Sequence, residues 1–256
     1  MATFRVGTQF HPQHTTYASF ASGVQKAEEL GVDTIWNWDH FYPLYGEPQG
    51  NHFEGWTTLT AIATLTSRAE IGCLVSCNSY RNPSLLANMA KTVDHISNGR
   101  LIFGIGAGWF ERDYTEYGYE FGTAPDRLRA LRAALPVFKQ RWEVEVPPPI
   151  RNPIPILIGG GGEKVTLKLT AQYANIWNGF GPADSYKRKN EILDNWCQEV
   201  NRDPAEIERS ISIQPGDLDH LDDLADAGAT HFILGMGEPW DFAAVERLLK
   251  WRDSQS

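Results

Sequence analysis

The chain has 256 residues, with 23 Lys and Arg against 32 Asp and Glu, and a formal net charge of −9. The acidic balance and the lack of any basic run argue against nucleic acid and anionic membranes as partners. No apolar run reaches the roughly 18 residues of a membrane span, and the N-terminus lacks a signal-peptide pattern, so we expect a cytoplasmic protein.

Strand and helix patterns alternate along the chain. Apolar runs predict strands at residues 4–10, 34–38, 71–76, 101–105, 154–158, 174–178, 208–213 and 230–234. Helical periodicity predicts helices at residues 17–30, 55–67, 83–96, 125–141, 163–173, 185–200, 218–227 and 240–251. Eight such repeats indicate an α/β fold, and a single (β/α)8 TIM barrel over residues 1–256 is its natural closure. A doubly wound open sheet is the alternative, since periodicity does not separate the two.

The residues that follow the predicted strands indicate where chemistry would occur, because the active site of such a barrel lies at the C-terminal strand ends. These residues are rich in histidine, aromatics and glycine and poor in paired carboxylates. That lining is typical of a pocket for a flat aromatic cofactor, and less of a glycosidase or a metal–phosphate site. His11 and His14 are three apart, but no further ligands follow later strands, so we predict no metal site.

Asp39-His40-Phe41, after the second predicted strand, is the sharpest short signal. Histidine titrates near neutrality and can hold or pass a proton, so His40 is the candidate catalytic residue. A polar strand end with satisfied hydrogen bonds is the alternative interpretation of the same three residues.

Two glycine-rich turns follow the fourth and fifth predicted strands. The first is Gly106-Ala107-Gly108-Trp109, and it lacks the third glycine of a dinucleotide fingerprint. The second, residues 159–162, precedes a predicted helix, and backbone N–H groups at a helix start suit an anion. Lys164 and Lys168 would add positive charge if they faced that turn.

These motifs together resemble the luciferase-like monooxygenases, and within them the actinobacterial branch that uses the deazaflavin coenzyme F420. The resemblance covers essentially the whole chain and is strongest over residues 33–120 and 154–200. It implies a cytoplasmic oxidoreductase that moves hydride to or from an unidentified small organic substrate, with His40 in the active site. The alternatives are a monooxygenase of the same fold that uses reduced FMN, and a catalytically silent flavin- or deazaflavin-binding protein.

The resemblance also implies residue roles. The cofactor would be bound by Asp39, Cys73, Leu74, Asn78, Gly106, Ala107, Gly108, Gly159, Gly160, Gly161, Gly162 and Val165. The substrate pocket would include His11, Tyr42, Trp109 and Trp177. Relatives often carry a non-prolyl cis peptide at the end of the third strand, for which Cys73–Leu74 is the first candidate and Leu74–Val75 the second. Relatives are often dimers, so we expect a homodimer.

Two departures from the family pattern qualify these expectations. Related deazaflavin sugar dehydrogenases carry a glutamate acid where Trp109 stands, which argues against a proton donor in this turn and against a sugar-phosphate substrate. The segment between Trp142 and the fifth predicted strand is short, which predicts a shorter wall of the substrate pocket.

Overall fold

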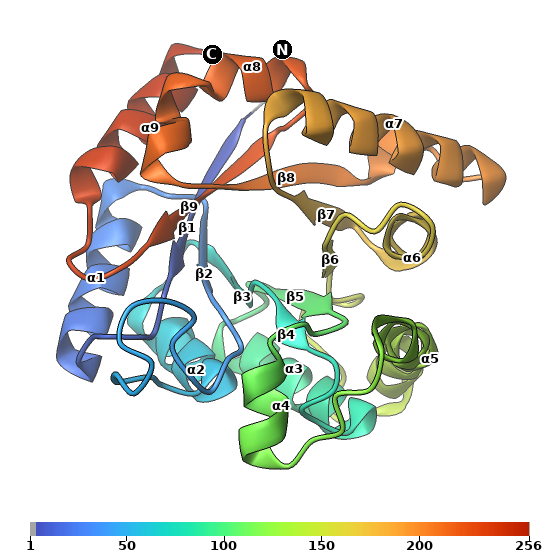
Figure 1. Cartoon of the computed structure of the whole chain (residues 1–256). Helices are drawn as coiled ribbons and strands as arrows, with labels where there is room; N and C mark the ends of the chain where they lie inside the picture. The colour runs from blue at the N-terminus through green and yellow to red at the C-terminus, as the bar shows by residue number, and fades with distance from the viewer. Residues whose placement is uncertain (1–3, 256) are drawn as a thin grey trace.

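The computed structural model describes residues 4–255 and is a ring of parallel strands surrounded by helices (Figure 1). The remaining residues of the predicted 1–256 domain, 1–3 and 256, lie outside this description. The strands are β1 (Arg5–Phe10), β2 (Thr34–Asn37), β3 (Glu70–Cys73), β4 (Ser76–Cys77), β5 (Leu101–Gly106), β6 (Ile156–Gly159), β7 (Ile176–Gly179), β8 (Glu208–Ile213) and β9 (His231–Met236).

The helices cover the outside of the ring. They are α1 (Tyr17–Leu30), α2 (Gly55–Leu65), α3 (Pro83–Ile96), α4 (Glu111–Tyr117), α5 (Ala124–Val144), α6 (Thr166–Tyr173), α7 (Ala183–Glu199), α8 (Leu221–Asp226) and α9 (Phe242–Ser254), with 3-10 turns η1 (Pro204–Glu206) and η2 (Pro215–Asp219). None of the helices in residues 4–255 has the length and apolar character needed to cross a membrane.

The sheet closes into a barrel. Its strand order is β3-β2-β1-β9-β8-β7-β6-β5-β4, and β3 also pairs with β5, so the ring has no free edge. Every pairing between these strands is parallel. Because β3 and β4 are the two parts of one interrupted strand, the nine strands of residues 4–255 form an eight-stranded barrel. The predicted (β/α)8 barrel is confirmed, and the open sheet is excluded.

Side chains of neighbouring strand residues enter two separate cores. Ile102 points into the barrel and packs with Trp36, Leu157 and Ile233. Its neighbour Phe103 points outward into the larger core between strands and helices. Both faces of each strand are therefore buried, which explains why the strands read as apolar runs without alternation.

Capping residues set where the helices begin and end. Thr16 caps α1 by accepting from the Ser19 backbone N–H, and Gly31 ends α1 with a φ of 95°. Asn82 caps α3, whose first residue is Pro83. These boundaries fix the loops that follow the strands, and those loops carry the site.

The structure corrects several predicted elements. The predicted third strand, 71–76, is interrupted by a cis peptide at Leu74–Val75, so the second candidate bond is confirmed and Cys73–Leu74 is wrong. α6 begins at Thr166, because residues 163–165 form a turn after the glycine run. The predicted helix 218–227 divides into η2 and α8. The short α4, after β5, was not predicted.

Candidate functional site

Two adjoining cavities lie at the C-terminal ends of the strands. The glycine cavity, of about 520 Å³, is lined on one side by Gly106, Ala107 and Gly108 and on the other by Gly159 and Gly160. The histidine cavity, of about 300 Å³, is lined chiefly by Gln9, His11, Trp38, Asp39, His40 and Tyr45. Leu74, Val75, Gly108 and Trp109 line both cavities. The interrupted strand therefore forms the boundary between two chemically different halves of one barrel mouth.

The walls of the glycine cavity require glycine. A Cβ on Gly159 would stand 2.9 Å from Val75 Cγ1, and one on Gly106 would stand 2.7 Å from Val75 Cγ2. Gly108 has a φ of 85°, and a Cβ there would fall 2.6 Å from the Cys77 thiol sulfur. Side chains at these positions would collide with Val75 or with the base of the turn. At these three glycines the backbone itself is therefore the surface that a ligand would meet.

His40 is held by a buried carboxylate. Its Nδ1 lies 2.7 Å from Oδ2 of Asp113, which is fully buried in the first turn of α4. Asp113 also accepts hydrogen bonds from the Tyr80 hydroxyl at 3.0 Å and from the backbone N–H groups of Phe41 and Tyr42 at 3.1 and 3.2 Å. Since Nδ1 is engaged with Asp113, Nε2 is the ring nitrogen left to act in the cavity. This pairing fixes the orientation of the His40 ring.

Asp39 is tied into the wall behind His40. Arg81 donates to its two carboxylate oxygens at 2.7 and 2.9 Å, and the Cys77 backbone N–H donates at 2.9 Å. Arg81 also pairs with Glu54. Burial alone would raise the pKa of Glu54, but hydrogen bonds from Thr57 and the Arg81 charge hold it below its usual value. Asp39 thus lines the histidine cavity with both of its carboxylate oxygens already hydrogen-bonded.

A second group of histidines surrounds Trp38. His11 stacks on the Trp38 ring with centroids 4.2 Å apart, and the Trp38 indole donates to His52 Nε2 at 3.0 Å. The Tyr45 hydroxyl is hydrogen-bonded to His11 Nδ1. Burial lowers the pKa of both His11 and His52 to about 4, so both rings are neutral at physiological pH. Burial also raises the pKa of Tyr45 to about 12.

The glycine run 159–162 has a cation beside it, though not either of the predicted ones. The Lys189 ammonium, from α7, lies 2.7 Å from where a Gly161 Cβ would be. Lys168 instead packs its ammonium over the Trp196 ring at 4.5 Å, and Lys164 is exposed. The charge near this turn therefore comes from the next helix in the chain.

The structure places some predicted site residues away from both cavities. Trp177 is fully buried on the outer side of β7, where its indole donates to the Gly160 carbonyl at 2.8 Å and its ring stacks on Tyr186. Tyr42 packs under the Arg112 guanidinium at 3.9 Å. Neither lines a cavity as predicted: Trp177 points to the outer side of β7, and Tyr42 lies in the loop after β2, with its ring against Arg112.

Five predicted cofactor residues also do not line either cavity. Cys73 faces the outer core, and Asn78 is joined to the site only through its backbone N–H, which donates to the Gly106 carbonyl at 3.0 Å. The others lie on the far half of the glycine run and beyond it; they are Gly161, Gly162 and Val165. The structure brings together the rest, namely His11, Asp39, His40, Leu74, Gly106, Ala107, Gly108, Trp109, Gly159 and Gly160.

Sequence reasoning missed the residues that act from a distance along the chain. Asp113 and Arg81 engage His40 and Asp39 across separations of 73 and 42 residues. Tyr45 and Lys189 reach the site from a loop and from a later helix. Only Asp113 carried a usable signal, because it closely follows the glycine turn that the motif analysis singled out.

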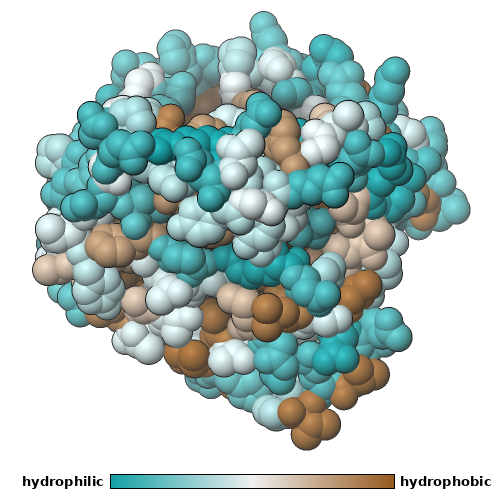
Figure 2. Space-filling view, turned by 60° about the horizontal axis from the view of Figure 1, so that its bottom comes forward, coloured by the Kyte–Doolittle hydropathy of each residue, from teal (hydrophilic) through white to brown (hydrophobic). Residues whose placement is uncertain are grey.

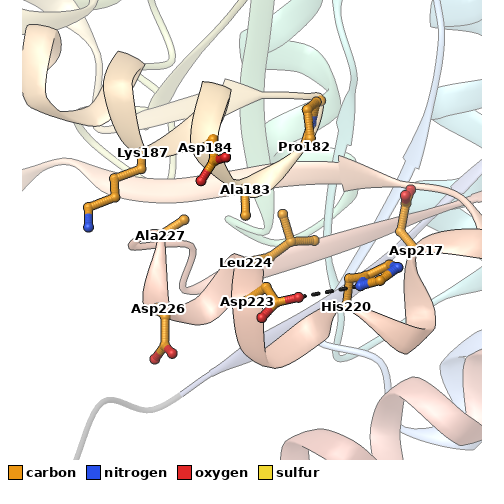
Figure 3. A pocket seen from close by; sticks show the side chains of 11 residues that line it. Pro182, Ala183, Asp184, Lys187, Asp217, His220, Asp223, Leu224, Asp226 and Ala227 are labelled. Carbon is orange, nitrogen blue, oxygen red and sulfur yellow. Dashed lines mark hydrogen bonds and ion pairs between the residues drawn. The ribbon is translucent and has the colours of Figure 1, made fainter.

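A third cavity, of about 520 Å³, lies outside the barrel mouth between the start of α7 and α8 (Figure 3). Its lining includes four aspartates and one lysine, and Asp223 pairs with His220 at 3.3 Å, as Figure 3 shows. It contains none of the predicted site residues. Within residues 4–255, no three His, Cys, Asp or Glu side chains are grouped as metal ligands.

The chain belongs to the luciferase-like monooxygenase family, whose family model matches residues 1–253. One relative is the F420-dependent glucose-6-phosphate dehydrogenase of Amycolatopsis mediterranei (strain U-32), 29% identical over 158 residues, which are 55% of this chain. That match spans 46% of the relative, so the chain covers just under half of the relative's length.

Solved structures share the fold. An F420-dependent secondary alcohol dehydrogenase in complex with an F420–acetone adduct matches with a TM-score of 0.85 and 17% identity, covering 94% of this chain and 96% of that one. The oxygenating constituent of 3,6-diketocamphane monooxygenase from Pseudomonas putida, in complex with FMN, matches with a TM-score of 0.67 and 17% identity over 84% and 67% of the two chains. At these identities the likeness establishes the luciferase-like barrel.

Proposed function

We propose that this protein is an oxidoreductase that uses coenzyme F420 to move hydride to or from a small organic substrate. The observation that carries the proposal is the position of His40. It lies in the histidine cavity, is paired at 2.7 Å with the buried Asp113, and adjoins a second cavity walled by glycine backbone. A proton-handling group beside a flat, backbone-lined cavity is what hydride transfer between a planar cofactor and a substrate requires.

The glycine cavity suits the planar part of the cofactor. Val75 stands between Gly106 and Gly159, where added Cβ atoms would collide with it, so the wall has no room for side chains of its own. The glycine run and the nearby Lys189 suit an anionic group, since backbone N–H groups and a cation both favour negative charge. When bound, F420 supplies a hydride-accepting or hydride-donating carbon.

His40 would handle the proton that accompanies the hydride. Asp113 holds Nδ1, so Nε2 would give a proton to a substrate oxygen during reduction or take one during oxidation. Trp109, where related sugar dehydrogenases carry a glutamate acid, offers no titrating group. The His40–Asp113 pair is therefore the proton-handling unit in the proposed reaction.

An anaerobic binding titration tests the choice of cofactor. We expect F420 to bind more tightly than FMN, as measured by its absorbance and fluorescence. Tighter binding of FMN, with consumption of O₂ by the reduced complex, would instead indicate the monooxygenase alternative, which the FMN-bound neighbour favours. Binding of F420 without turnover of any alcohol or carbonyl would indicate a silent carrier.

We also propose that the protein is a homodimer that uses the outer face of α2 and α3. α2 contains no charged residue, and the charged Lys91 and Asp94 of α3 are buried. Leu85 and Ile96 of α3 are 55% and 41% exposed. Figure 2 shows one face of the molecule, where hydrophobic residues stand among hydrophilic ones. We expect a dimeric mass at micromolar concentration by sedimentation, and a monomer for Leu85→Glu; a monomeric wild type would contradict the proposal.

A further inference from the structure

The histidine cavity has no lysine or arginine with which an anionic substrate could pair. Its only carboxylate, Asp39, is engaged by Arg81 and by the Cys77 backbone N–H. Arg81 also pairs with Glu54, so its charge is shared by two carboxylates. His40 is engaged at Nδ1 by the buried Asp113. An anionic substrate would lose its hydration here without gaining an opposite charge, which is costly.

Tyr45 combines exposure with a fixed hydroxyl. The residue is 52% exposed, yet its hydroxyl is hydrogen-bonded to His11 Nδ1. Its backbone carbonyl is bonded to His14 Nε2 at 2.8 Å and to Gln13 Nε2 at 3.4 Å. The loop that follows β1 thus holds both ends of one tyrosine. Such anchoring presents the hydroxyl to the cavity in a single position.

Tyr45 and His40 approach the same aromatic floor. Both rings stand edge-on to Trp38, with centroids 6.0 Å away for Tyr45 and 5.8 Å for His40, and both line the cavity. His11 covers a face of the same Trp38 ring. If the neutral His11 donates its Nδ1 proton to the Tyr45 oxygen, the Tyr45 proton is free to point at a ligand.

We propose that the Tyr45 hydroxyl, held by His11, is the hydrogen-bond donor that fixes the oxygen of an uncharged carbonyl or alcohol substrate in the histidine cavity. This inference rests on the proposed hydride transfer. It assigns Tyr45 to substrate binding and leaves proton transfer to His40. Because burial keeps the pKa of His11 near 4 and that of Tyr45 near 12, the arrangement is unchanged across the neutral range.

A chromophoric aldehyde tests the assignment without turnover. The absorption band of 4-(dimethylamino)benzaldehyde moves to longer wavelength when its carbonyl oxygen accepts a hydrogen bond. We expect it to bind the wild-type protein with such a shift, and we expect the anionic 4-carboxybenzaldehyde not to bind. No binding of the uncharged probe, or equal binding of the anionic one, would overturn the substrate class.

Substitutions identify which residue donates the hydrogen bond that shifts the absorption of the probe. Tyr45→Phe should abolish the shift and weaken binding of the probe by about three- to tenfold, the effect of one lost hydrogen bond. His11→Phe, which keeps a ring stacked on Trp38, should reduce the shift. Tyr42→Phe should leave it in place, since Tyr42 packs under Arg112 outside the cavity. A shift that survives in Tyr45→Phe, or that Tyr42→Phe removes, would overturn the role of Tyr45.

A separate measurement tests the proposed function independently of the role of Tyr45. F420 titration of the same samples reports the cofactor, and Tyr45→Phe should bind F420 as the wild type does. A protein that shows the Tyr45-dependent shift but does not bind F420 would contradict the proposed function and keep this inference. Circular dichroism should show that Tyr45→Phe folds normally, because the removed hydroxyl belongs to a half-exposed side chain.

Discussion

The two cavities at the barrel mouth are built in opposite ways. The glycine cavity is lined by four glycines and by apolar or uncharged polar side chains, and none of these titrates. The histidine cavity is made of side chains, with His40, His11, Asp39 and Tyr45 placed by long-range hydrogen bonds. The first should therefore be damaged by adding atoms and the second by removing functional groups or by changing pH.

The largest effect should come from removing the proton-handling ring. We expect His40→Ala to leave F420 affinity within a few-fold and to lower turnover by about 10²- to 10⁴-fold, the usual contribution of a general acid or base. His220→Ala, at an exposed histidine of the outer cavity, is the matched control and should not change either value. A large loss of F420 affinity with normal turnover per bound site would make His40 a binding residue only.

Acid should destabilise the protein through the two buried histidines beside Trp38. His11 and His52 have a folded-state pKa of about 4, depressed by burial, against 6.5 when unfolded. Below pH 6.5 the unfolded state binds protons that the folded state does not, so the free energy of unfolding should fall from about pH 6.5 to 4 by up to about 3 kcal/mol per histidine. Urea unfolding measured against pH tests this prediction. His11→Phe should flatten the dependence, and an unchanged slope would contradict it.

Asp113→Asn should separate positioning from folding. The amide keeps the shape of the carboxylate but loses its negative charge beside His40 Nδ1. We expect turnover to fall by about ten- to a hundredfold, which corresponds to losing a charge-assisted hydrogen bond. Normal turnover in a protein that unfolds more easily would indicate a structural role alone.

The smallest effect should come from adding one methyl group to the glycine cavity. Gly159→Ala would place a Cβ 2.9 Å from Val75 Cγ1, so the wall must shift, and F420 affinity should fall by about tenfold. Gly216→Ala is the control, because no atom lies within 4 Å of the added Cβ. Unchanged F420 affinity in Gly159→Ala would show that the cofactor does not meet this wall.

The sequence allowed prediction of what depends on local pattern. The helix 17–30 and the strand 208–213 were predicted with the boundaries that the structure shows; a cap and a terminal glycine define the helix, and the strand carries β-branched isoleucines. The direction of Trp177 could not be predicted, since both faces of its strand are apolar and the pattern does not say which residue points inward. The partners of His40 and Tyr45 depend on contacts that only the closed barrel brings together.

Asp113 has a consequence for how this barrel mouth could be re-engineered. One carboxylate orients His40 and also accepts the backbone N–H groups of Phe41 and Tyr42. The loop after β2 and the helix α4 therefore depend on each other structurally. They are far apart in the sequence, since α2, β3, β4, α3 and β5 lie between them. A loop grafted from a relative without its matching α4 would bring His40 into a mouth that no longer orients it, so exchanges of substrate preference should succeed only when both segments are moved together.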